Sequence, residues 1–481
     1  MLSIFNTVTG KIEPFKPIKK GKVGMYVCGP TVYDYIHIGN ARAFVSTDII
    51  RRYLEHKGYA VTYVSNVTDV DDKTIAKAKE MGISLQQLSE KYTDAYFEDI
   101  LKLHIKKPDV NPRATQHISE IIDLIQNLMD KGYGYVVDGD VYFDILKFDE
   151  YGRLSGNRAE ALRLGARIEP DPRKRNLADF ALWKKCKQGE PCWDSPWGRG
   201  RPGWHIECSA MAMKYLGECF DIHAGGKDLV FPHHENEIAQ SEAATGKTFV
   251  KYWLHNEWLT VDGKKMSKSL GNFITVRDAL KQYDPQVLRL FFASVHYRSP
   301  IDFNEKNLAQ AKRNLEKLLN SIQALAELRE RNRKTPKAEA LFRAVELMKE
   351  KFEEAMDDDF NTPLAISALM GLTKKINKYV ESQSEIKPEI KERIVAIFEE
   401  FVQNVLGVDL KLHETKPEYS KLEKDLIGLV IELRQKMRQR KDWGISDYMR
   451  RKLQAIGLNI QDTPEGTQWS LEEKLHNPSS R

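Results

Sequence analysis

The sequence has few cysteines and no long apolar run. These two features argue against a membrane-spanning protein and against a disulfide-stabilised secreted protein. No window approaches the ~18 uninterrupted apolar residues that a membrane span needs, and the first residues lack the pattern of a signal peptide. Only five of the 481 residues are cysteines. An odd number spread over a long chain argues against a disulfide framework and for a reducing compartment. We therefore predict a soluble cytoplasmic protein.

Length and charge add little to this. A chain of 481 residues exceeds what one hydrophobic core usually supports, so two to four domains are expected. The formal net charge of +5 is spread over a large molecule and identifies no partner.

The first third of the chain alternates strand and helix patterns. Residues 22–28 read as a buried strand that stops at Gly-Pro, residues 39–56 carry helical spacing, and residues 60–67 read as a second strand. Strand, helix and strand in fewer than ~50 residues predict a βαβ unit with a parallel sheet. Ligands of such sheets bind at the carboxyl ends of the strands, which places residues 28–40 at the expected site.

The loop that follows the first strand has the composition of a phosphate site. Gly39 stands at the expected helix N-terminus, where free N–H groups favour an anion. His37 adds an imidazole that can supply a hydrogen bond or a charge. A tight turn with a chance histidine would explain this segment equally well if it stood alone.

A lysine-rich loop lies far downstream, after the turn pair Asp262-Gly263. Two lysines on a small-residue loop, Lys265 and Lys268, make a cationic clamp suited to charge on a triphosphate. A solvated charge run is the simpler interpretation of such a segment taken alone.

Together, H-I-G-N at residues 37–40 and K-M-S-K-S at residues 265–269 resemble the two signatures of class I aminoacyl-tRNA synthetases. The resemblance implies that His37, Gly39 and Asn40 flank the phosphates of ATP, which is bound with Mg²⁺. It implies that Lys265 and Lys268 hold them from a mobile loop, and it gives His37, Asn40 and Lys268 the catalytic roles. Asn40 departs from the family pattern, which usually has histidine there.

A second constellation combines Cys28, Cys208, His233 and Glu237. His233 and Glu237 are four residues apart, so one helix face presents both, and two sulfurs, a nitrogen and an oxygen suit tetrahedral zinc. Buried core cysteines beside a surface helix stay possible on spacing alone. No second histidine completes an H-E-x-x-H motif, which argues against a zinc protease.

Longer strings decide between these interpretations. C-G-P-T-V-Y-D at 28–34, P-G-W-H-I-E-C-S at 202–209 and F-P-H-H-E-N-E-I-A-Q at 231–240 resemble cysteinyl-tRNA synthetases. That family joins L-cysteine to tRNA(Cys), and the resemblance implies one zinc held at the four matched positions, with the substrate thiolate as a further ligand. It also places Gly29, Thr68, Trp204 and His223 around the amino acid, and Gly225, Gly226 and Asp228 near the adenosine.

The end of the chain carries a local basic stripe. Between residues 434 and 452 there are eight Lys or Arg against two acids, which suits phosphate contacts but equally a solvated helix face. The string at 440–469 resembles the anticodon-binding end of the same family. The resemblance assigns anticodon contacts to Arg438, Trp443, Asp447 and Asp462. The remaining cysteines, Cys186, Cys192 and Cys219, match no ligand position and are interpreted as structural thiols.

The predicted fold class is α/β: a Rossmann-type parallel-sheet catalytic domain with an insertion, an α-helical bundle and a small C-terminal anticodon-binding module. The predicted boundaries are 1–118 and 201–262 for the two catalytic halves, 119–200 for the insertion, 263–305 for the K-M-S-K-S loop and stem-contact region, 306–410 for the bundle, and 411–481 for the terminal module.

Three other functions are compatible with parts of the sequence. A cysteine ligase of thiol biosynthesis, which acts on an amino sugar, is expected to lack the basic tail that this chain has. A non-catalytic RNA-binding relative is disfavoured by the intact K-M-S-K-S string and the complete ligand set, and a zinc hydrolase by the missing histidine. The expected protein is a monomer without a membrane partner.

Overall fold

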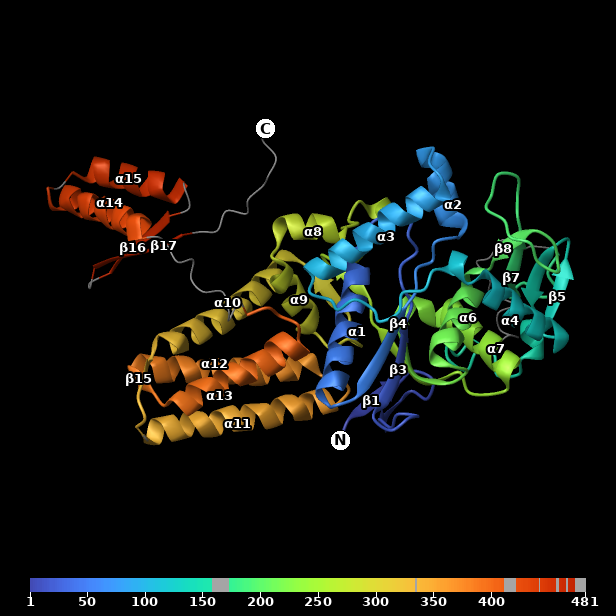
Figure 1. The fold of residues 1–481 in the computed structure, drawn as a ribbon, viewed down its shortest axis with the longest axis horizontal. Coiled ribbons are helices and arrows are strands. Elements are labelled where there is room, and N and C mark those ends of the chain that lie inside the picture. The colour runs from blue at the N-terminus through green and yellow to red at the C-terminus, as the bar shows by residue number, and fades with distance from the viewer. Residues whose placement is uncertain are drawn as a thin grey trace. The chain divides into compact units, whose positions relative to one another are not determined.

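The computed structural model describes residues 1–157, 173–333, 335–410, 421–440, 442–455, 458–463 and 466–471. They belong to two compact units, Met1–Leu410 and Lys411–Arg481, which are traced in Figure 1 and described separately below. A search of the described helices found none with the length and apolar character of a membrane span.

A four-stranded parallel sheet forms the centre of the first unit. Its order is β10-β9-β3-β4, with β3 (Lys22–Val27), β4 (Ala60–Ser65), β9 (Phe220–Gly226) and β10 (Val250–Asn256). Helix α1 (Ile38–His56) connects β3 to β4, which confirms the predicted βαβ unit. The strand order reverses between β3 and β9, and a crevice at the carboxyl ends of the strands is expected at such a switch point.

Both faces of the central sheet are covered, which explains why the sequence of β3 is almost entirely apolar. Met25, Tyr26 and Val27 are each at most 1% exposed, as expected for a strand of a parallel sheet that is covered on both sides. Figure 1 shows α1 packed along this sheet, with α3 (Leu85–Lys102) beyond it.

The insertion builds a second, antiparallel sheet with the order β5-β6-β7-β8. Its core, which includes Ile125, Phe143 and Trp183, packs against Ile206 and Ala239 of two helices from the second half of the α/β domain. The elements are α4 (Ile118–Asp130), β5 (Gly134–Val137), β6 (Asp140–Phe143), β7 (Phe180–Lys185), β8 (Gly200–Pro202), α6 (Trp204–Leu216) and α7 (Glu235–Thr245).

After the α/β domain the unit becomes a helical bundle, as the sequence predicts. Asn361 caps the helix that follows it, and its side chain accepts a hydrogen bond from the Leu364 N–H, with Pro363 in the first turn. The helices are α10 (Glu305–Glu327), α11 (Pro336–Asp357), α12 (Thr362–Ser382) and α13 (Pro388–Phe398), followed by a π-helical segment at Glu399–Val405.

Short elements complete the unit. They are β1 (Ser3–Asn6), β2 (Lys11–Pro14), α2 (Asp72–Met81), β11 (Leu259–Val261), β12 (Lys264–Lys265), α8 (Val276–Gln282), α9 (Pro285–Ala293), β13 (Ile301–Phe303), β14 (Arg329–Glu330) and β15 (Glu385–Ile386).

The predicted absence of disulfides is wrong at one place. Cys186 and Cys192 form a disulfide, with their Cα atoms 5.9 Å apart. The chain between β7 and β8 folds back on itself, because Trp193 and Gly200 exchange backbone hydrogen bonds. This reversal brings two cysteines that are six positions apart within bonding distance. Cys28, Cys208 and Cys219 are free thiols.

The second unit consists of α14 (Lys421–Gln439), α15 (Trp443–Ala455) and the hairpin β16 (Leu458–Thr463) and β17 (Gly466–Leu471). Its small core contains Ile431, Leu458 and Ile460.

One buried ion pair joins the α/β domain to the end of the bundle. Arg289 of α9 is fully buried and pairs with Asp48 of α1. Its remaining N–H groups donate to the Leu406 carbonyl (2.6 Å) and the Leu103 carbonyl (2.9 Å). Burial by itself would raise the pKa of Asp48, but Arg289 and Arg52 lower it, so the carboxylate is charged and its partner is indispensable.

We predict that Arg289→Leu lowers the free energy of unfolding by about 3–5 kcal/mol, because it leaves the Asp48 charge buried without its partner. Urea denaturation followed by circular dichroism measures the change. Lys281→Ala, which breaks the exposed pair with Asp278, serves as the control and is expected to change stability by at most about 0.5 kcal/mol. Equal effects of the two variants would contradict the role of the buried pair.

Candidate active site and metal centre

A cavity of about 520 Å³ lies at the carboxyl ends of β3 and β9, the position expected from the strand order. Both signature segments line it, and they lie next to each other: the Phe273 ring is 5.4 Å from the His37 ring and 5.0 Å from Lys268 Nζ. The predicted site residues on its wall are Cys28, Gly29, His37, Gly39, Asn40, Thr68, Trp204, Cys208, Gly225, Gly226, Asp228, His233, Lys265 and Lys268.

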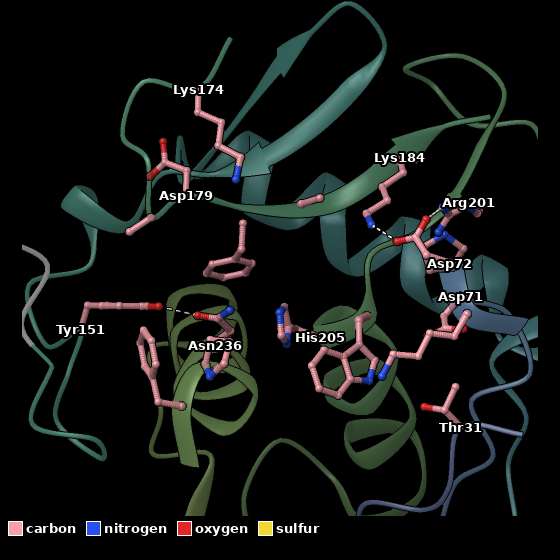
Figure 2. A pocket seen from close by; sticks show the side chains of 18 residues that line it. Thr31, Asp71, Asp72, Tyr151, Lys174, Asp179, Lys184, Arg201, His205 and Asn236 are labelled. Atoms are coloured by element: carbon pink, nitrogen blue, oxygen red, sulfur yellow. Dashed lines mark hydrogen bonds and ion pairs between the residues drawn. The ribbon is translucent and has the colours of Figure 1, made fainter. Parts of the chain in front are cut away.

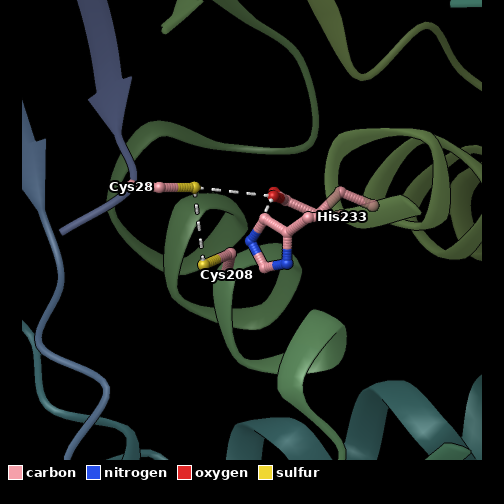
Figure 3. Close-up of side chains that lie close together, drawn as sticks. Cys28, Cys208 and His233 are labelled. Atoms are coloured by element: carbon pink, nitrogen blue, oxygen red, sulfur yellow. Dashed lines mark hydrogen bonds and ion pairs between the residues drawn. The ribbon is translucent and has the colours of Figure 1, made fainter. Parts of the chain in front are cut away.

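At the base of this cavity the predicted metal-binding residues come together (Figure 3). The sulfurs of Cys28 and Cys208 are 3.9 Å apart, and the Cys28 sulfur is 3.7 Å from Glu237 Oε1. His233 Nε2 lies 3.1 Å from the same carboxylate oxygen. All four donor atoms lie within 4.8 Å of one another, although Cys28 and Cys208 are 180 residues apart in sequence.

The spacing of these donors fits a tetrahedral zinc ion. Zinc–sulfur bonds of about 2.3 Å and zinc–nitrogen or zinc–oxygen bonds of about 2.0–2.1 Å place two sulfurs about 3.8 Å apart and a nitrogen and an oxygen about 3.3 Å apart. The sulfur pair at 3.9 Å and the His233–Glu237 pair at 3.1 Å are close to these values. Two soft and two harder donors are also the chemistry that zinc accepts.

Because these four side chains are buried close together, each shifts the pKa values of its neighbours. Burial favours the neutral form of Glu237, but His223 and His233 outweigh it and lower the Glu237 pKa to about 2. Burial would likewise lower the pKa of His233, but the Glu237 charge raises it to about 10. The hydrogen bond from Cys28 lowers the pKa of Cys208 to about 6, whereas burial raises the pKa of Cys28. The cluster therefore contains a carboxylate and a readily ionised thiol, which are metal-binding forms.

The single helix expected to present His233 and Glu237 is in two parts. His233 lies in a π-helical segment, Val230–His234, and Glu237 lies in α7, which begins at Glu235. Phe231 has extended backbone angles within that segment, and the Phe231–Pro232 peptide is cis. His233 and Glu237 still lie on one face, as their contact distance shows.

His223 does not line the cavity but lies behind Glu237. Its Nε2 is 3.0 Å from Glu237 Oε2, and both side chains are fully buried. A second possible donor group, Cys28, His223, His234 and Glu237, shares two members with the first. We favour the first group, because His223 then orients the carboxylate through its far oxygen, as partners of metal ligands commonly do.

Sequence reasoning gave no role to three further histidines that surround the cluster. His205 Nδ1 is 2.9 Å from His233 Nδ1. His234 Nε2 is 3.4 Å from the Cys28 sulfur, and His234 Nδ1 is 2.8 Å from His255 Nε2. Burial lowers the pKa of all three, so they are neutral. For His205 and His234 the available signal was the density of histidine in W-H-I-E-C and H-H-E-N-E, whereas His255 stands alone on β10.

On the opposite side of the cavity, His37 caps α1. Its Nδ1 accepts hydrogen bonds from the Gly39 and Asn40 N–H groups, at 3.1 and 3.2 Å. Burial, with a smaller contribution from Lys268, lowers the His37 pKa to about 4. His37 is thus neutral, with its proton on Nε2, and it offers a hydrogen bond and no charge. Gly39 is required there, because a Cβ atom would come within 2.9 Å of the imidazole.

Asn40 completes a reciprocal cap. Its Oδ1 accepts the His37 N–H at 3.1 Å, so the amide oxygen is engaged with the backbone. Asn40 therefore stabilises the start of α1 in this chain. Its NH₂ group can still donate a hydrogen bond to a ligand.

The loop lysine has a partner that sequence reasoning missed. Lys268 Nζ lies 2.5 Å from Asp34 Oδ2 and 5.0 Å from the centre of the Phe273 ring. The side chains of Asp34 and Lys268 remain 28% and 60% exposed, so the pair is accessible from the cavity. Asp34 belongs to C-G-P-T-V-Y-D, but its role depends on a contact 234 residues away.

Two of the residues predicted to surround the amino acid, Gly29 and Thr68, are joined through Asn66. The Gly29 N–H donates to Asn66 Oδ1 at 2.9 Å, and Asn66 Nδ2 donates to Thr68 Oγ1 at 3.2 Å. Trp204, also predicted to surround the amino acid, lines the cavity and is 39% exposed. Across the cavity, Gly225, Gly226 and Asp228 form the wall where β9 ends.

In the second unit, three of the four predicted anticodon residues have described side chains. The Arg438 guanidinium lies 5.9 Å from the centre of the Trp443 ring, and Trp443 is 55% exposed. Asp447, also on α15, is exposed. Asp462 belongs to β16, but its side chain lies outside the described residues.

Sequence comparisons agree with this geometry. A family model described as the catalytic domain of class I (C) tRNA synthetases matches residues 14–313, and one described as a DALR domain matches residues 351–411. The chain is 48% identical over 476 residues to a cysteine–tRNA ligase of Fusobacterium nucleatum, covering 98% of this chain and 100% of that protein. It is 51% identical over 472 residues to one of a Geobacillus species, covering 97% and 99%.

Solved structures share the fold at low sequence identity. A methionyl-tRNA synthetase of Mycobacterium tuberculosis in complex with methionyl-adenylate has a TM-score of 0.61 at 15% identity, covering 80% of this chain and 92% of that one. A LeuRS of Agrobacterium radiobacter has a TM-score of 0.60 at 12% identity, covering 84% and 86%.

We predict that Gly29→Ala destabilises the protein, because its Cβ would lie 1.6 Å from the Asn66 carbonyl oxygen. Backbone must move to relieve this clash, and the expected loss is at least about 1–3 kcal/mol of unfolding free energy, measured by urea denaturation. Gly371→Ala is the matched control. It lies in α12 with nothing within 4 Å of the added Cβ, so a gain of about 0.5–1 kcal/mol is expected. Equal stabilities of the two variants would contradict the prediction.

Proposed function

The chain belongs to the cysteine–tRNA ligase family of class I tRNA synthetases, and we propose which of its residues select cysteine, activate it and pass it to tRNA. As a member of this family it is a ligase that uses ATP to join cysteine to tRNA. The observation that carries the residue assignment is one cavity that is lined by two groups of residues: the thiol and imidazole donors of the metal cluster, and the N-terminus of α1 with the adjoining lysine loop.

In the activation step the cysteine carboxylate attacks the α-phosphorus of ATP, and pyrophosphate leaves. The N-terminus of α1 and the Nε2–H of neutral His37 donate hydrogen bonds to the phosphates. Lys268 leaves Asp34 and provides the positive charge, with Mg²⁺ as the expected counter-ion of ATP and Lys265 nearby. Gly225, Gly226 and Asp228 form the proposed adenosine wall.

Cysteine is selected at the base of the cavity. Cys28, Cys208, His233 and Glu237 are the residues that would hold zinc, and bound zinc prefers a thiolate to a neutral hydroxyl. An apolar pocket separates such near-isosteres only by ~10- to 200-fold, so zinc held by these residues would supply the further selectivity. His223 holds Glu237 in place, and Gly29, Thr68 and Trp204 enclose the rest of the amino acid.

The second unit supplies the proposed tRNA contacts. Trp443, stacked near Arg438, offers an exposed ring to an unpaired base, and Asp447 and Asp462 are the further proposed anticodon contacts. An amino-sugar ligase of thiol biosynthesis and a non-catalytic relative are not favoured, since the curated cysteine–tRNA ligases match the chain over nearly its full length. A monomer in the cytoplasm stays a prediction.

We predict that Lys268→Ala reduces the turnover of cysteine-dependent ATP–pyrophosphate exchange by ~100-fold or more, because it removes a charge that stabilises the transition state. Lys264→Ala is the control, since Lys264 lies on the neighbouring strand but not on the cavity wall, and it is expected to retain at least half of the wild-type rate. Unchanged exchange in Lys268→Ala would remove this lysine from the mechanism.

A second prediction concerns the metal. Elemental analysis of the purified wild type is expected to find about one zinc per chain, and Cys208→Ser is expected to lose most of it and to discriminate cysteine from serine no better than ~100-fold. Cys219→Ser, which changes an exposed free thiol, is the control and should behave as the wild type. A zinc-free wild type with its selectivity intact would refute the proposed metal site.

A further inference from the structure

Arg42, near the start of α1, is a buried cation whose hydrogen-bond acceptors are backbone carbonyls. The residue is 1% exposed, and its two terminal nitrogens donate to five carbonyl oxygens from two distant segments. These carbonyls belong to Glu257, Trp258, His296, Tyr297 and Ser299. Burial lowers the pKa of Arg42 to about 10, so the guanidinium is still charged at neutral pH. A charge in the interior costs free energy, and here it fixes two chain segments against α1.

Both segments lead directly into the small sheet that carries the lysine loop. Residues 257–258 immediately precede β11, and residues 296–299 precede β13. Strand β11 pairs with β13 and also with β12, which contains Lys265. Arg42 contacts the two segments where they already join each other through backbone hydrogen bonds. The position at which the lysine loop begins is therefore set relative to α1.

The far end of the lysine loop is attached to the start of α1 by the backbone itself. Residues 36–38 are joined to residues 274–276 by two backbone hydrogen bonds, of 2.9 and 3.1 Å. Lys268 lies between these bonds and the segment that Arg42 holds. The loop is thus fastened to one helix at both ends, by a side chain at its entry and by main chain at its exit.

The second segment is also anchored on its other side, in the helical bundle. Asp359, which is buried, accepts a hydrogen bond from the Tyr297 hydroxyl at 2.7 Å through Oδ1. Its Oδ2 accepts one from Arg298 Nε at 2.5 Å. Residues 296–299 therefore lie between two fixed points, Asp359 and Arg42, and a shift of this segment would break contacts at one of them.

We propose that Arg42 is a positioning residue for activation: it sets where the lysine loop begins and thereby the reach of Lys268 toward the phosphates. The proposal rests on the proposed function, which gives Lys268 its role. Lys268 is paired with Asp34 and is 60% exposed, so it moves to a phosphate while the base of its loop stays in place. A misplacement of about 1 Å can cost ~100-fold in rate, so the attachment of the loop affects catalysis directly.

The test is a double-mutant cycle between Arg42→Lys and Lys268→Ala, measured by cysteine-dependent ATP–pyrophosphate exchange. Lysine keeps the charge, but its single nitrogen lacks the rigid fork of donors that reaches carbonyls of both segments. If Arg42 acts through the loop lysine, its replacement matters only while that lysine is present. A residue that only stabilises the fold would lower the rate by the same factor in both backgrounds. Zinc content and the burst of adenylate formation count the active molecules in each preparation.

We expect Arg42→Lys to lower the kcat of exchange by ~10- to 100-fold, with the KM for cysteine within twofold of wild type. The KM is spared because other elements hold the metal cluster. In the Lys268→Ala background the same substitution should lower kcat by less than ~3-fold, since the position of the missing amine no longer matters.

Arg51→Lys is the matched control, because Arg51 is a buried arginine of the same helix that holds a different segment. It donates to the Lys107 carbonyl at 2.8 Å and pairs with Glu55 and Asp109. None of these partners belongs to the lysine loop or to the sheet that carries it. Exchange per active molecule should stay within twofold of wild type.

Asp359→Asn tests the same attachment with Arg42 intact. Asparagine tolerates the left-handed backbone of this residue, whose φ is 54°. Its amide oxygen can still accept the Tyr297 hydroxyl, but its NH₂ group cannot accept from Arg298. We expect a kcat lowered by a smaller factor, ~3- to 10-fold, and again little further loss in the Lys268→Ala background.

Three results would overturn the proposal. Unchanged exchange in Arg42→Lys would exclude a positioning role, equal losses with and without Lys268 would make Arg42 a purely structural residue, and a raised KM for cysteine at unchanged kcat would move its effect to the amino-acid site. Should Arg42→Lys fail to fold, equal losses for Asp359→Asn in the two backgrounds would overturn it in the same way. Unchanged exchange in Lys268→Ala alone would instead contradict the proposed function.

Discussion

Burial of the Glu237 carboxylate is the constraint around which the site is built. An ionised carboxylate in the interior is tolerated only when both oxygens have partners. His223 faces one oxygen and His233 the other, at 3.0 and 3.1 Å. The sulfurs of Cys28 and Cys208 then lie beside an anionic centre, where the proposed zinc ion would compensate the negative charge. The parallel pairing of β3 with β9 brings these distant segments together.

The same energetic demand explains the neutral histidines outside the cluster. A row of contacts runs from Thr7 through His255 and His234 to the sulfur of Cys28. Additional charge there would be opposed by burial, so these imidazoles fix orientation through hydrogen bonds. His37 obeys the same rule at the other end of the cavity, where its low pKa makes it a neutral donor. In the proposed phosphate site, positive charge would consequently have to come from lysine.

Much of this could be predicted from local sequence. The βαβ unit, the cap at Asn361 and the convergence of four donors follow from periodicity and from strings that resemble one family, and the structure agrees with each. What could not be predicted depends on contacts between distant segments. Examples are the pairing of Lys268 with Asp34, the position of His223 behind Glu237, and the chain reversal that joins Cys186 to Cys192. Spacing along the chain contains no information about such reversals or about which side of a carboxylate a histidine occupies.

The position of Trp204 joins the walls of two cavities. One face of its ring is stacked on His233, and its side chain lines both the active-site cavity and an adjoining one of about 760 Å³ beside Phe180 of the insertion sheet (Figure 2). A side chain shared in this way cannot move in one cavity without altering the surroundings in the other. Because His233 is also fixed by His205 and Glu237, the imidazole itself resists displacement, and any adjustment falls on the partly exposed indole. Displacement of Trp204 would therefore alter the walls of both cavities, the one lined by the signature segments and the adjoining one lined by Phe180, while the contacts of His233 would keep the donor cluster in place.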